Sequence, residues 1–247
     1  MEDVFGMEPK KAKVGSVFQT NCGSPLVVLE YTSAKKILVV FQDGLSSAFY
    51  AHIGNLRKGK YTNPYAKTMA GHGFHGEGLY SSKTHKAFYK TWVYMLIRCY
   101  SEVEKADRPH TAEHSCCEEW LNFQNFARWC EGQPGSSLTG WELDKDVLRK
   151  GNVVYSEDAC CFIPRRINTI FPKRYAQGDR AYLTSDGEWQ CQVRLEGKRK
   201  TFKSKDREKV VTFKVKATKE ILTSLANTYK DSLAPHVYEA LLSWEGY

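Results

Sequence analysis

Short runs of β-branched and aromatic residues recur near the start of the chain, separated by turn-forming residues. The runs are VFQT, PLVVLEYT, KKILVVFQ and SSAFYAHI, and the breaks between them contain NCGS, SA and DG. Runs of this length and composition are typical of strands, and breaks of this kind are typical of turns. The pattern predicts a small β barrel-like unit in residues 1–60, built from Val14 to Lys60.

A helical period replaces this pattern farther along the chain. Residues 61–84 are rich in Gly, His, Ser and Tyr and predict a linker or loop. A helix is expected from Thr84 or His85, because five apolar residues then fall on one face, at positions 88, 92, 95, 96 and 99. A second helix is expected from Cys117 to Cys130, before the turn GQPG. We interpret both apolar faces as core.

The next segment, WELDKDVL, predicts a strand followed by the turn RKGN.

The last part of the chain predicts a sheet followed by helices. DRAYLT, EWQCQVRLE and KRKTFKS are expected to be strands, joined by the turns SDGE and EGK. Ser204 is expected to cap a long helix, and Pro235 opens a short final one. The whole pattern predicts an α+β chain with four parts. These are a β unit (1–60), a linker (61–84), a central domain (85–173), and a three-stranded antiparallel sheet backed by a helix (174–247).

Composition narrows the class of protein. The chain has 247 residues, 42% hydrophobic and 26% charged, which excludes general disorder. No apolar run approaches the roughly 20 residues that span a bilayer, and MEDVFGMEPKK lacks the apolar stretch of an export signal. We therefore expect a cytoplasmic protein with no membrane partner. The eight cysteines are expected to be thiols rather than a disulfide framework.

Positive charge is concentrated near the C-terminus. The formal net charge is +8, and residues 194–219 hold eleven basic and three acidic residues, a surplus as large as that of the whole chain. A cluster of this kind favours an anionic partner. The alternative is a solvated, lysine-rich helix face.

Alternation along the predicted strands sorts their side chains into two faces. Ala181, Leu183, Cys191, Val193, Leu195 and Phe202 share the face expected to pack on the helix. The opposite face carries Arg180, Tyr182, Gln190, Gln192, Arg194, Arg199 and Thr201. Arginine pairs with guanine and glutamine with adenine in the major groove, which admits a β ribbon. Double-stranded DNA is therefore the predicted partner, with Lys198, Lys200 and Lys203 supplying phosphate contacts. A polar, solvated face is the alternative.

Three motifs in the middle of the chain carry a family resemblance. KTWVYMLIRCY, CCEEWLNFQNFARW and LDKDVLRKGNVVYSEDACCFIPRRIN, in that order, resemble bacteriophage-encoded proteins related to HNH homing endonucleases. The C-terminal block resembles the DNA-binding domain of plant ethylene-response factors, with QCQVRLEGKRKTF as its second and third strands. The resemblance covers residues 84 to 228. It implies a degenerate ββα, HNH-like central unit, Gln192 and Arg194 facing DNA, and a location in the cytoplasm of an infected bacterial host.

The HNH resemblance implies specific roles for residues after WEL. An HNH site needs an acidic metal ligand, a histidine that activates water, a loop asparagine and a further ligand from a helix. Asp144 and Asn152 match the acidic residue and the loop asparagine, and Asn168 matches the helix ligand, but Lys145 takes the place of histidine. Lysine is ordinarily protonated and would repel a metal ion. Asp146 could supply a second carboxylate. A Mg²⁺-dependent site of Asp144, Asp146 and Asn152 therefore stays open beside a purely structural turn.

Cysteine and histidine residues raise the question of zinc. Cys99, Cys117 and Cys160 could converge with His114, and Cys116, Cys161 and His110 are near them in sequence. Their spacing is not that of a short ligand pair such as C-x-x-C, so we assign no cofactor, with Mg²⁺ open for an active nuclease and structural zinc also open. His72 and His75 have no cysteine or acidic partner at ligand spacing.

Three functions are compatible with these features. The favoured one is a phage-type double-stranded DNA-binding protein that acts by sequence-selective binding, as in repression or interference, without cleavage. The second is a metal-dependent, HNH-like DNA endonuclease or nickase. The third is a protein-interaction module that binds a protein partner through residues 14–60, where Phe41, Phe49 and Tyr50 are either surface or core.

Overall fold

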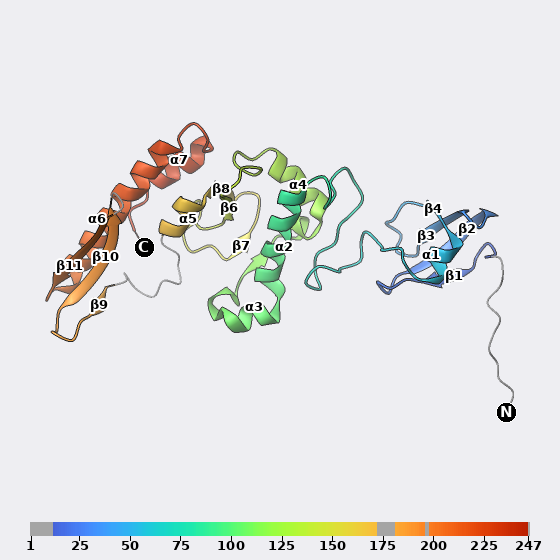
Figure 1. The fold of residues 1–247 in the computed structure, drawn as a ribbon, viewed down its shortest axis with the longest axis horizontal. Helices are drawn as coiled ribbons and strands as arrows, with labels where there is room; N and C mark the ends of the chain where they lie inside the picture. The colour runs from blue at the N-terminus through green and yellow to red at the C-terminus, as the bar shows by residue number, and fades with distance from the viewer. Residues whose placement is uncertain (1–11, 172–180, 196–197, 247) are drawn as a thin grey trace, which may run out of the picture. The chain divides into compact units, whose positions relative to one another are not determined.

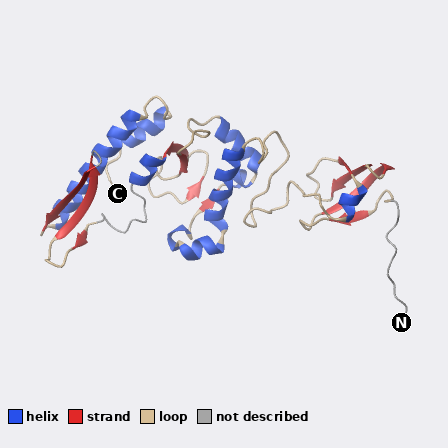
Figure 2. Cartoon of the chain, viewed as in Figure 1, coloured by secondary structure: helices blue, strands red, loops and turns tan. Residues whose placement is uncertain are grey.

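The computed structural model describes residues 12–171, 181–195 and 198–246. Helices and small sheets are mixed along the chain (Figure 1; Figure 2). The chain divides into two compact units, Met1–Leu79 with Asn122–Gln124, and Tyr80–Leu121 with Asn125–Tyr247. Within the described ranges, no helix combines the length and the apolar character needed to cross a membrane.

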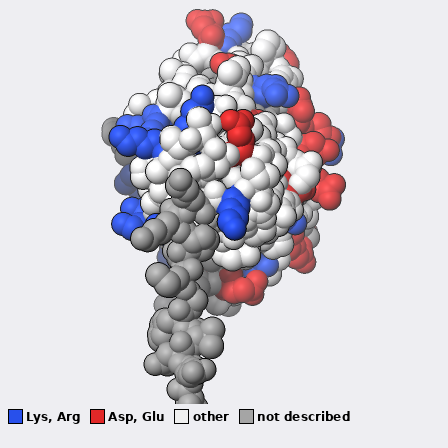
Figure 3. All heavy atoms as spheres, turned by 90° about the vertical axis from the view of Figure 1, so that its right-hand side faces the viewer, with Lys and Arg blue, Asp and Glu red and all other residues white. Residues whose placement is uncertain are grey.

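The first unit contains an antiparallel meander. Its strands pair in the order β1-β2-β3-β4 and have the bounds Val17–Gln19, Pro25–Ser33, Lys36–Phe41 and Phe49–Ala51. A short helix α1 (Ile53–Arg57) follows. Alternate positions on β2 and β3 are buried, including Leu26, Val28, Ile37, Val39 and Phe41. No pairing between β1 and β4 closes the sheet in the described residues. Both signs of charge are present on the face drawn in Figure 3.

The predicted linker is a loop with little regular structure. Between residues 61 and 79, the described backbone has only two isolated bridges, Met69 with Gly73 and Phe74 with Asn122. The Phe123 amide also donates to the Phe74 carbonyl at 3.0 Å. These contacts explain why Asn122–Gln124 belong to the first unit.

The helical part begins where the pattern places it. Helix α2 (Lys86–Tyr100) follows His85 and buries one apolar stripe of Trp92, Met95, Leu96 and Cys99. The prediction of one continuous helix from Cys117 to Cys130 is wrong. A 3₁₀ turn η2 (Glu118–Leu121) is separated from α4 (Phe123–Glu131) at Asn122, whose Oδ1 accepts the Gln124 amide at 3.0 Å. That contact is of the kind by which asparagine begins a new helix. Helix α3 (Glu102–Asp107) and the turn η1 (Pro109–Thr111) were not predicted.

A strand, a loop, a second strand and a helix follow. Strand β6 (Trp141–Asp144) pairs antiparallel with β8 (Cys161–Pro164), and α5 (Arg165–Ile170) comes directly after β8. A parallel pair of two-residue strands, β5 (Ser115–Cys116) and β7 (Val154–Tyr155), lies in the same unit. Strand β6 ends at Asp144, earlier than the predicted strand WELDKDVL. It ends there because the Asp144 carboxylate accepts the amides of the next turn.

The C-terminal part is a three-stranded antiparallel sheet with helices. The strands are β9 (Tyr182–Leu183), β10 (Trp189–Leu195) and β11 (Lys198–Ser204), in the order β11-β10-β9. Helices α6 (Arg207–Thr228) and α7 (Pro235–Leu242) follow. This confirms the predicted sheet. The predicted cap is wrong, because Asp206 rather than Ser204 accepts the amides of Glu208 and Lys209.

One hydrophobic core joins the β6–β8–α5 segment to the last helices. Ile163 of β8 and Ile167 of α5 are fully buried, in the same cluster as Leu222 of α6 and Leu241 of α7. The expected boundary between residues 173 and 174 therefore crosses a part of the chain with a common core. This core holds α5 beside α6, and α6 carries the sheet.

Candidate nucleic-acid interface and HNH-like segment

A small pocket at the end of β6 brings together most of the residues expected in a nuclease site. Its volume is about 120 Å³, and the residues that line it include Arg98, His110, His114, Asp144, Lys145, Asp146 and Asn168. Asn152 lies in the adjacent loop and does not line the pocket. Most of the residues that were expected in a nuclease site are therefore close together, and the hydrogen bonds of each show its structural role.

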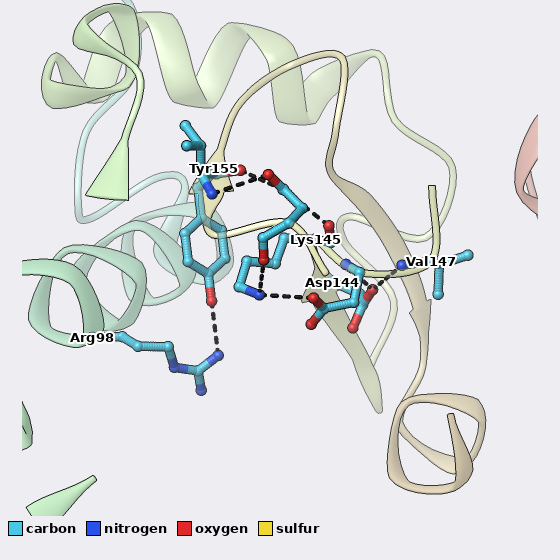
Figure 4. A network of polar contacts seen from close by, with 8 residues as sticks. Arg98, Asp144, Lys145, Val147 and Tyr155 are labelled. Carbon is cyan, nitrogen blue, oxygen red and sulfur yellow. Dashed lines mark hydrogen bonds and ion pairs between the residues drawn. The ribbon is translucent and has the colours of Figure 1, made fainter. Parts of the chain in front are cut away.

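Lys145 is buried in an ion pair (Figure 4). Its side chain is 4% exposed, and Nζ donates to Asp146 Oδ1 at 2.9 Å and to the Asn152 carbonyl at 2.6 Å. The ammonium group thus neutralises one of the two carboxylates that a metal ion would need. An ammonium group in this position also has no lone pair with which to accept a proton from water.

The Asp144 and Asn152 side chains hold the loop together. Asp144 Oδ1 accepts the amides of Asp146 and Val147, both at 2.8 Å. Asn152 Nδ2 donates to the carbonyls of Lys145 at 3.0 Å and Val154 at 2.6 Å, and its Oδ1 accepts the Val154 amide at 3.1 Å. These contacts are local and satisfy backbone groups, so both residues have a structural role in the loop.

Asn168, on α5, is only partly satisfied. Its Nδ2 donates to Glu142 Oε2 at 2.7 Å, but Oδ1 is buried and has no hydrogen-bond partner among the described residues. An unsatisfied buried acceptor costs about 1–3 kcal/mol. Because Asn168 also lines the pocket, this oxygen favours a bound donor or cation there.

The donors present do not fit a resident metal ion. Among the described residues, no group of three or more His, Cys, Asp and Glu side chains could hold one. Mg²⁺ demands near-octahedral oxygen coordination, usually with one or two carboxylates. Asp146 is paired with Lys145, and Asp144 Oδ1 is used by the backbone. One carboxylate oxygen of each aspartate and the side-chain oxygen of Asn152 are therefore engaged by other groups of the protein.

The zinc candidates also fail to assemble. Cys99, Cys117, Cys160 and His114 belong to no metal-holding group within the parts of the chain that the structure describes. All eight cysteines are free thiols. Burial raises the pKa of the Cys99, Cys117 and Cys160 thiols.

The pocket includes an arginine that the sequence pattern did not single out. Arg98 lies on α2, and its Nη1 donates to the Tyr155 hydroxyl at 3.0 Å (Figure 4). Burial raises the pKa of Tyr155, so the hydroxyl keeps its proton. The sequence signal for this position was a charged residue, Arg98, directly before Cys99, which belongs to the apolar face of the helix.

One face of the C-terminal sheet packs on α6. Cys191 and Val193 are buried, and the Phe202 ring stacks on Phe213 of α6 with centroids 4.6 Å apart. Predicted packing on the helix is confirmed for these three residues. It is wrong for Leu183, which is exposed because β9 pairs with β10 only at Trp189 and Gln190.

The opposite face is basic and largely exposed. Cross-strand pairs on this face are Gln190 with Lys203, Gln192 with Thr201, and Arg194 with Arg199. Arg194, Arg199, Thr201 and Lys203 are exposed, and Gln192 is half-buried. Lys203 Nζ lies 3.3 Å from Asp186 Oδ2. The predicted residues of β10 and β11 are thus brought together in adjacent rows.

Tyr182 organises one end of this face. It is 47% exposed, and its hydroxyl accepts the side-chain amides of both Gln190 and Gln192, the latter at 3.0 Å. Gln190 is only 9% exposed, so it supports Tyr182 and is not available for contact with a base edge. This corrects the expectation for Gln190.

The remaining basic candidates are distributed around the sheet. Lys200 is paired with Val193 in the register of β10 and β11. Its side chain therefore belongs to the sheet face that packs on α6, next to the basic face. Arg180 and the side chain of Lys198 lie outside the described residues. The basic candidates continue onto α6, where Lys209 is exposed and Lys214 Nζ donates to the Gln192 carbonyl at 2.9 Å.

Few of the candidate surface residues of the first unit are exposed. Phe41 is buried in the core, and Phe49 packs against it with ring centroids 5.8 Å apart. Tyr50 is 55% exposed, with Lys36 Nζ 4.8 Å from its ring centroid. Two of the three aromatic residues proposed for a protein partner therefore belong to the core.

No protein-family model, curated protein or solved structure matches this chain. Its function must therefore be argued from its own residues and their geometry.

Proposed function

We propose that the chain is a double-stranded DNA-binding protein that contacts base edges through the exposed face of the β9–β11 sheet and does not cut DNA. The Asp144–Asn152 loop, in this proposal, is a scaffold related to the HNH homing endonucleases of bacteriophages. The cytoplasm of an infected bacterial host is the corresponding location. Occupation of a DNA site without cleavage would repress or interfere with other proteins that use the site.

The pair Arg194 and Arg199 is the observation that carries this proposal. These two exposed residues are directly opposite each other on adjacent strands. Like charges in such a pair are destabilising, by an amount comparable to the roughly 0.2–1 kcal/mol of a favourable pair. A polyanion placed over the face would offset the repulsion. A fold that keeps a locally unfavourable pair on an exposed face is typical of a binding surface.

The size and chemistry of the face favour duplex DNA over other polyanions. A β ribbon fits a major groove about 12 Å wide, where arginine pairs with guanine and glutamine with adenine. Gln192 and Arg194 are two residues apart on β10, so their side chains lie on the same face of the sheet. Tyr182 fixes the Gln192 amide, which reduces the side-chain entropy lost on binding.

Lys145 supports binding without cleavage. Hydrolysis of a phosphodiester by an HNH site needs a base that accepts a proton from water and a metal ion that stabilises the charge on phosphate. The Lys145 ammonium takes the place of the base and is paired with Asp146. The contacts of the loop therefore provide neither the base nor the ligands of a metal ion.

The test is a selection of bound duplexes from a random pool, followed by titration of the selected site. We expect Arg194→Ala to weaken the selected site by about 1–3 kcal/mol, and random DNA by less, because it removes a base contact. Lys200→Ala is the matched control and should weaken both DNAs equally. Equal losses for both variants on both DNAs would leave only nonspecific phosphate binding. Absence of binding at low salt would refute the proposal.

Cleavage is the second candidate, because Asn168 Oδ1 is an unsatisfied acceptor in the pocket. Supercoiled plasmid is incubated with the protein and Mg²⁺ or Mn²⁺, and Asp144→Ala is the control. We expect the plasmid to stay supercoiled with both proteins. Nicking by the wild-type chain that disappears in Asp144→Ala would establish an endonuclease instead.

A further inference from the structure

A groove runs along the unpaired edge of β10, between the sheet and α5. Strand β9 pairs with β10 only at Trp189 and Gln190, so the described residues leave the rest of this edge without a strand neighbour. The groove has a volume of about 950 Å³ and is bounded by α5, β10 and α6. We call it the α5 groove.

The charge of the α5 groove is strongly positive. Among the described residues, it is lined by Arg165 and Arg166 of α5, Arg194 of β10 and Lys214 of α6, together with one carboxylate, that of Glu220. Arg165 is paired with Glu142 at 3.1 Å, and Lys214 donates to the Gln192 carbonyl at 2.9 Å. Arg166 and Arg194 are both exposed. These two are therefore the cations best placed to contact an anionic ligand.

The groove is continuous with the basic face of the sheet. Gln192 and Arg194 belong to that face and also line the α5 groove. A ribbon in the major groove has a phosphate backbone on each side of it, so cations beside the edge of the ribbon meet phosphates rather than bases. Arg166 is on the wall of the groove that faces this edge. Arg166 and Arg194 are both exposed and line the same groove.

We propose that the α5 groove binds the sugar-phosphate backbone of the same duplex that contacts the sheet, with Arg166 as a phosphate ligand. This inference rests on the proposed function and extends the DNA-binding surface to α5. The ββα segment, in this proposal, contributes to DNA affinity through its helix. The groove is also lined by apolar side chains, including Val193 and Ile221, which suit the deoxyribose rings.

The test compares salt dependence between two matched variants of the full chain. The affinity of Arg166→Ala for the selected duplex is measured between about 50 mM and about 200 mM salt, and Lys216→Ala is the control. Lys216 is an exposed cation of α6 that does not line the groove. One lost phosphate contact lowers the slope of log K against log salt by about 0.9. The wild-type affinity should therefore fall about 3.5-fold more than that of Arg166→Ala over this range.

Sequence preference provides the second readout. We expect Arg166→Ala to weaken selected and random duplexes by the same factor, because a phosphate contact carries no sequence information. Lys216→Ala should match the wild type in slope and affinity. Thermal unfolding of both variants shows whether the fold is kept, and exposed positions are expected to change stability by no more than about 0.5 kcal/mol.

The outcomes separate this proposal from the proposed function. If Arg194→Ala weakens the selected site but Arg166→Ala keeps the wild-type slope, the sheet binds DNA and the groove proposal is wrong. If Arg166→Ala instead loses affinity for polyglutamate and not for DNA, the groove binds an acidic polypeptide, which also overturns the proposal. If the wild-type chain binds no duplex, the proposed function itself fails.

Discussion

Lys145 and Arg194 are both cations in segments that were expected to meet DNA, and their surroundings are opposite. Lys145 is buried, with an anionic partner at 2.9 Å and a carbonyl at 2.6 Å. Arg194 is exposed, and its neighbour across the strand is a second arginine. The first segment satisfies its charges internally, whereas the second presents them to solvent. The difference supports our proposal that the Asp144–Asn152 loop is a structural element and that the sheet is the binding surface.

The largest expected effect comes from breaking the Lys145 ion pair. Lys145→Ala leaves Asp146 buried without its partner, which should lower the free energy of unfolding by about 3–5 kcal/mol. Urea unfolding measures the loss. Lys200→Ala, an exposed lysine of the sheet, is the control and should change stability by no more than about 0.5 kcal/mol.

A double substitution sharpens this prediction. Lys145→Met combined with Asp146→Leu removes both charges, and a buried pair replaced in this way is often neutral or stabilising. We expect the double variant to recover most of the stability that Lys145→Ala loses. If Lys145→Ala unfolds like the control, the ion pair has no structural role and the comparison with Arg194 loses its basis.

Substitutions of Asn152 and Asn168 should differ in their effect on the free energy of unfolding, with the larger loss at Asn152. Asn152→Ala removes three hydrogen bonds to the loop backbone and should cost about 1–3 kcal/mol. Asn168→Leu removes an acceptor that has no partner among the described residues, and with it one hydrogen bond to the half-buried Glu142. The two changes oppose each other, so the variant should stay within about 1 kcal/mol of the wild type.

Added metal provides an independent check on Asn168. A ligand that binds only the folded chain raises its Tm. We expect Mg²⁺ to leave the Tm of wild type and Asn168→Leu equally unchanged. A rise in the wild-type Tm that is absent in Asn168→Leu would show a metal site and contradict the scaffold interpretation.

The smallest expected effect is a gain in stability. Arg199→Gln removes one member of the like-charged pair, so the DNA-free protein should become more stable by about 0.2–1 kcal/mol, while binding becomes weaker. Thermal unfolding at low salt measures the gain, because salt screens exposed charges. A loss of stability would show that the two arginines are not in conflict.

The periodic parts of the fold were predictable from the sequence, and the breaks between them were less so. Apolar positions fixed the face of α2 and the strands of both larger sheets, because burial requires them. The end of β6 at Asp144 and the interruption at Asn122 depend on single side chains that accept backbone amides. Hydropathy does not report such contacts.

The candidate site was predictable only in part for a similar reason. Alternation placed Gln192, Arg194 and Thr201 on one face, which the register confirms. It also placed Gln190 there, but could not show that the Tyr182 hydroxyl holds its amide in a buried position. The groove residues Arg165 and Arg166 come from a distant segment, and their approach to β10 depends on the packing of α5 on α6.

The most direct test of the central claim is a gel titration of a selected duplex with the wild-type chain in the presence of Mg²⁺. Retarded bands report binding, and the length of the DNA recovered from them reports cleavage. We predict a retarded complex from which intact duplex is recovered, and loss of that complex in the variant with Arg194→Ala and Arg199→Ala. A duplex that is never retarded, or recovered DNA that has been cut, would contradict binding by the sheet over an inactive HNH-like scaffold.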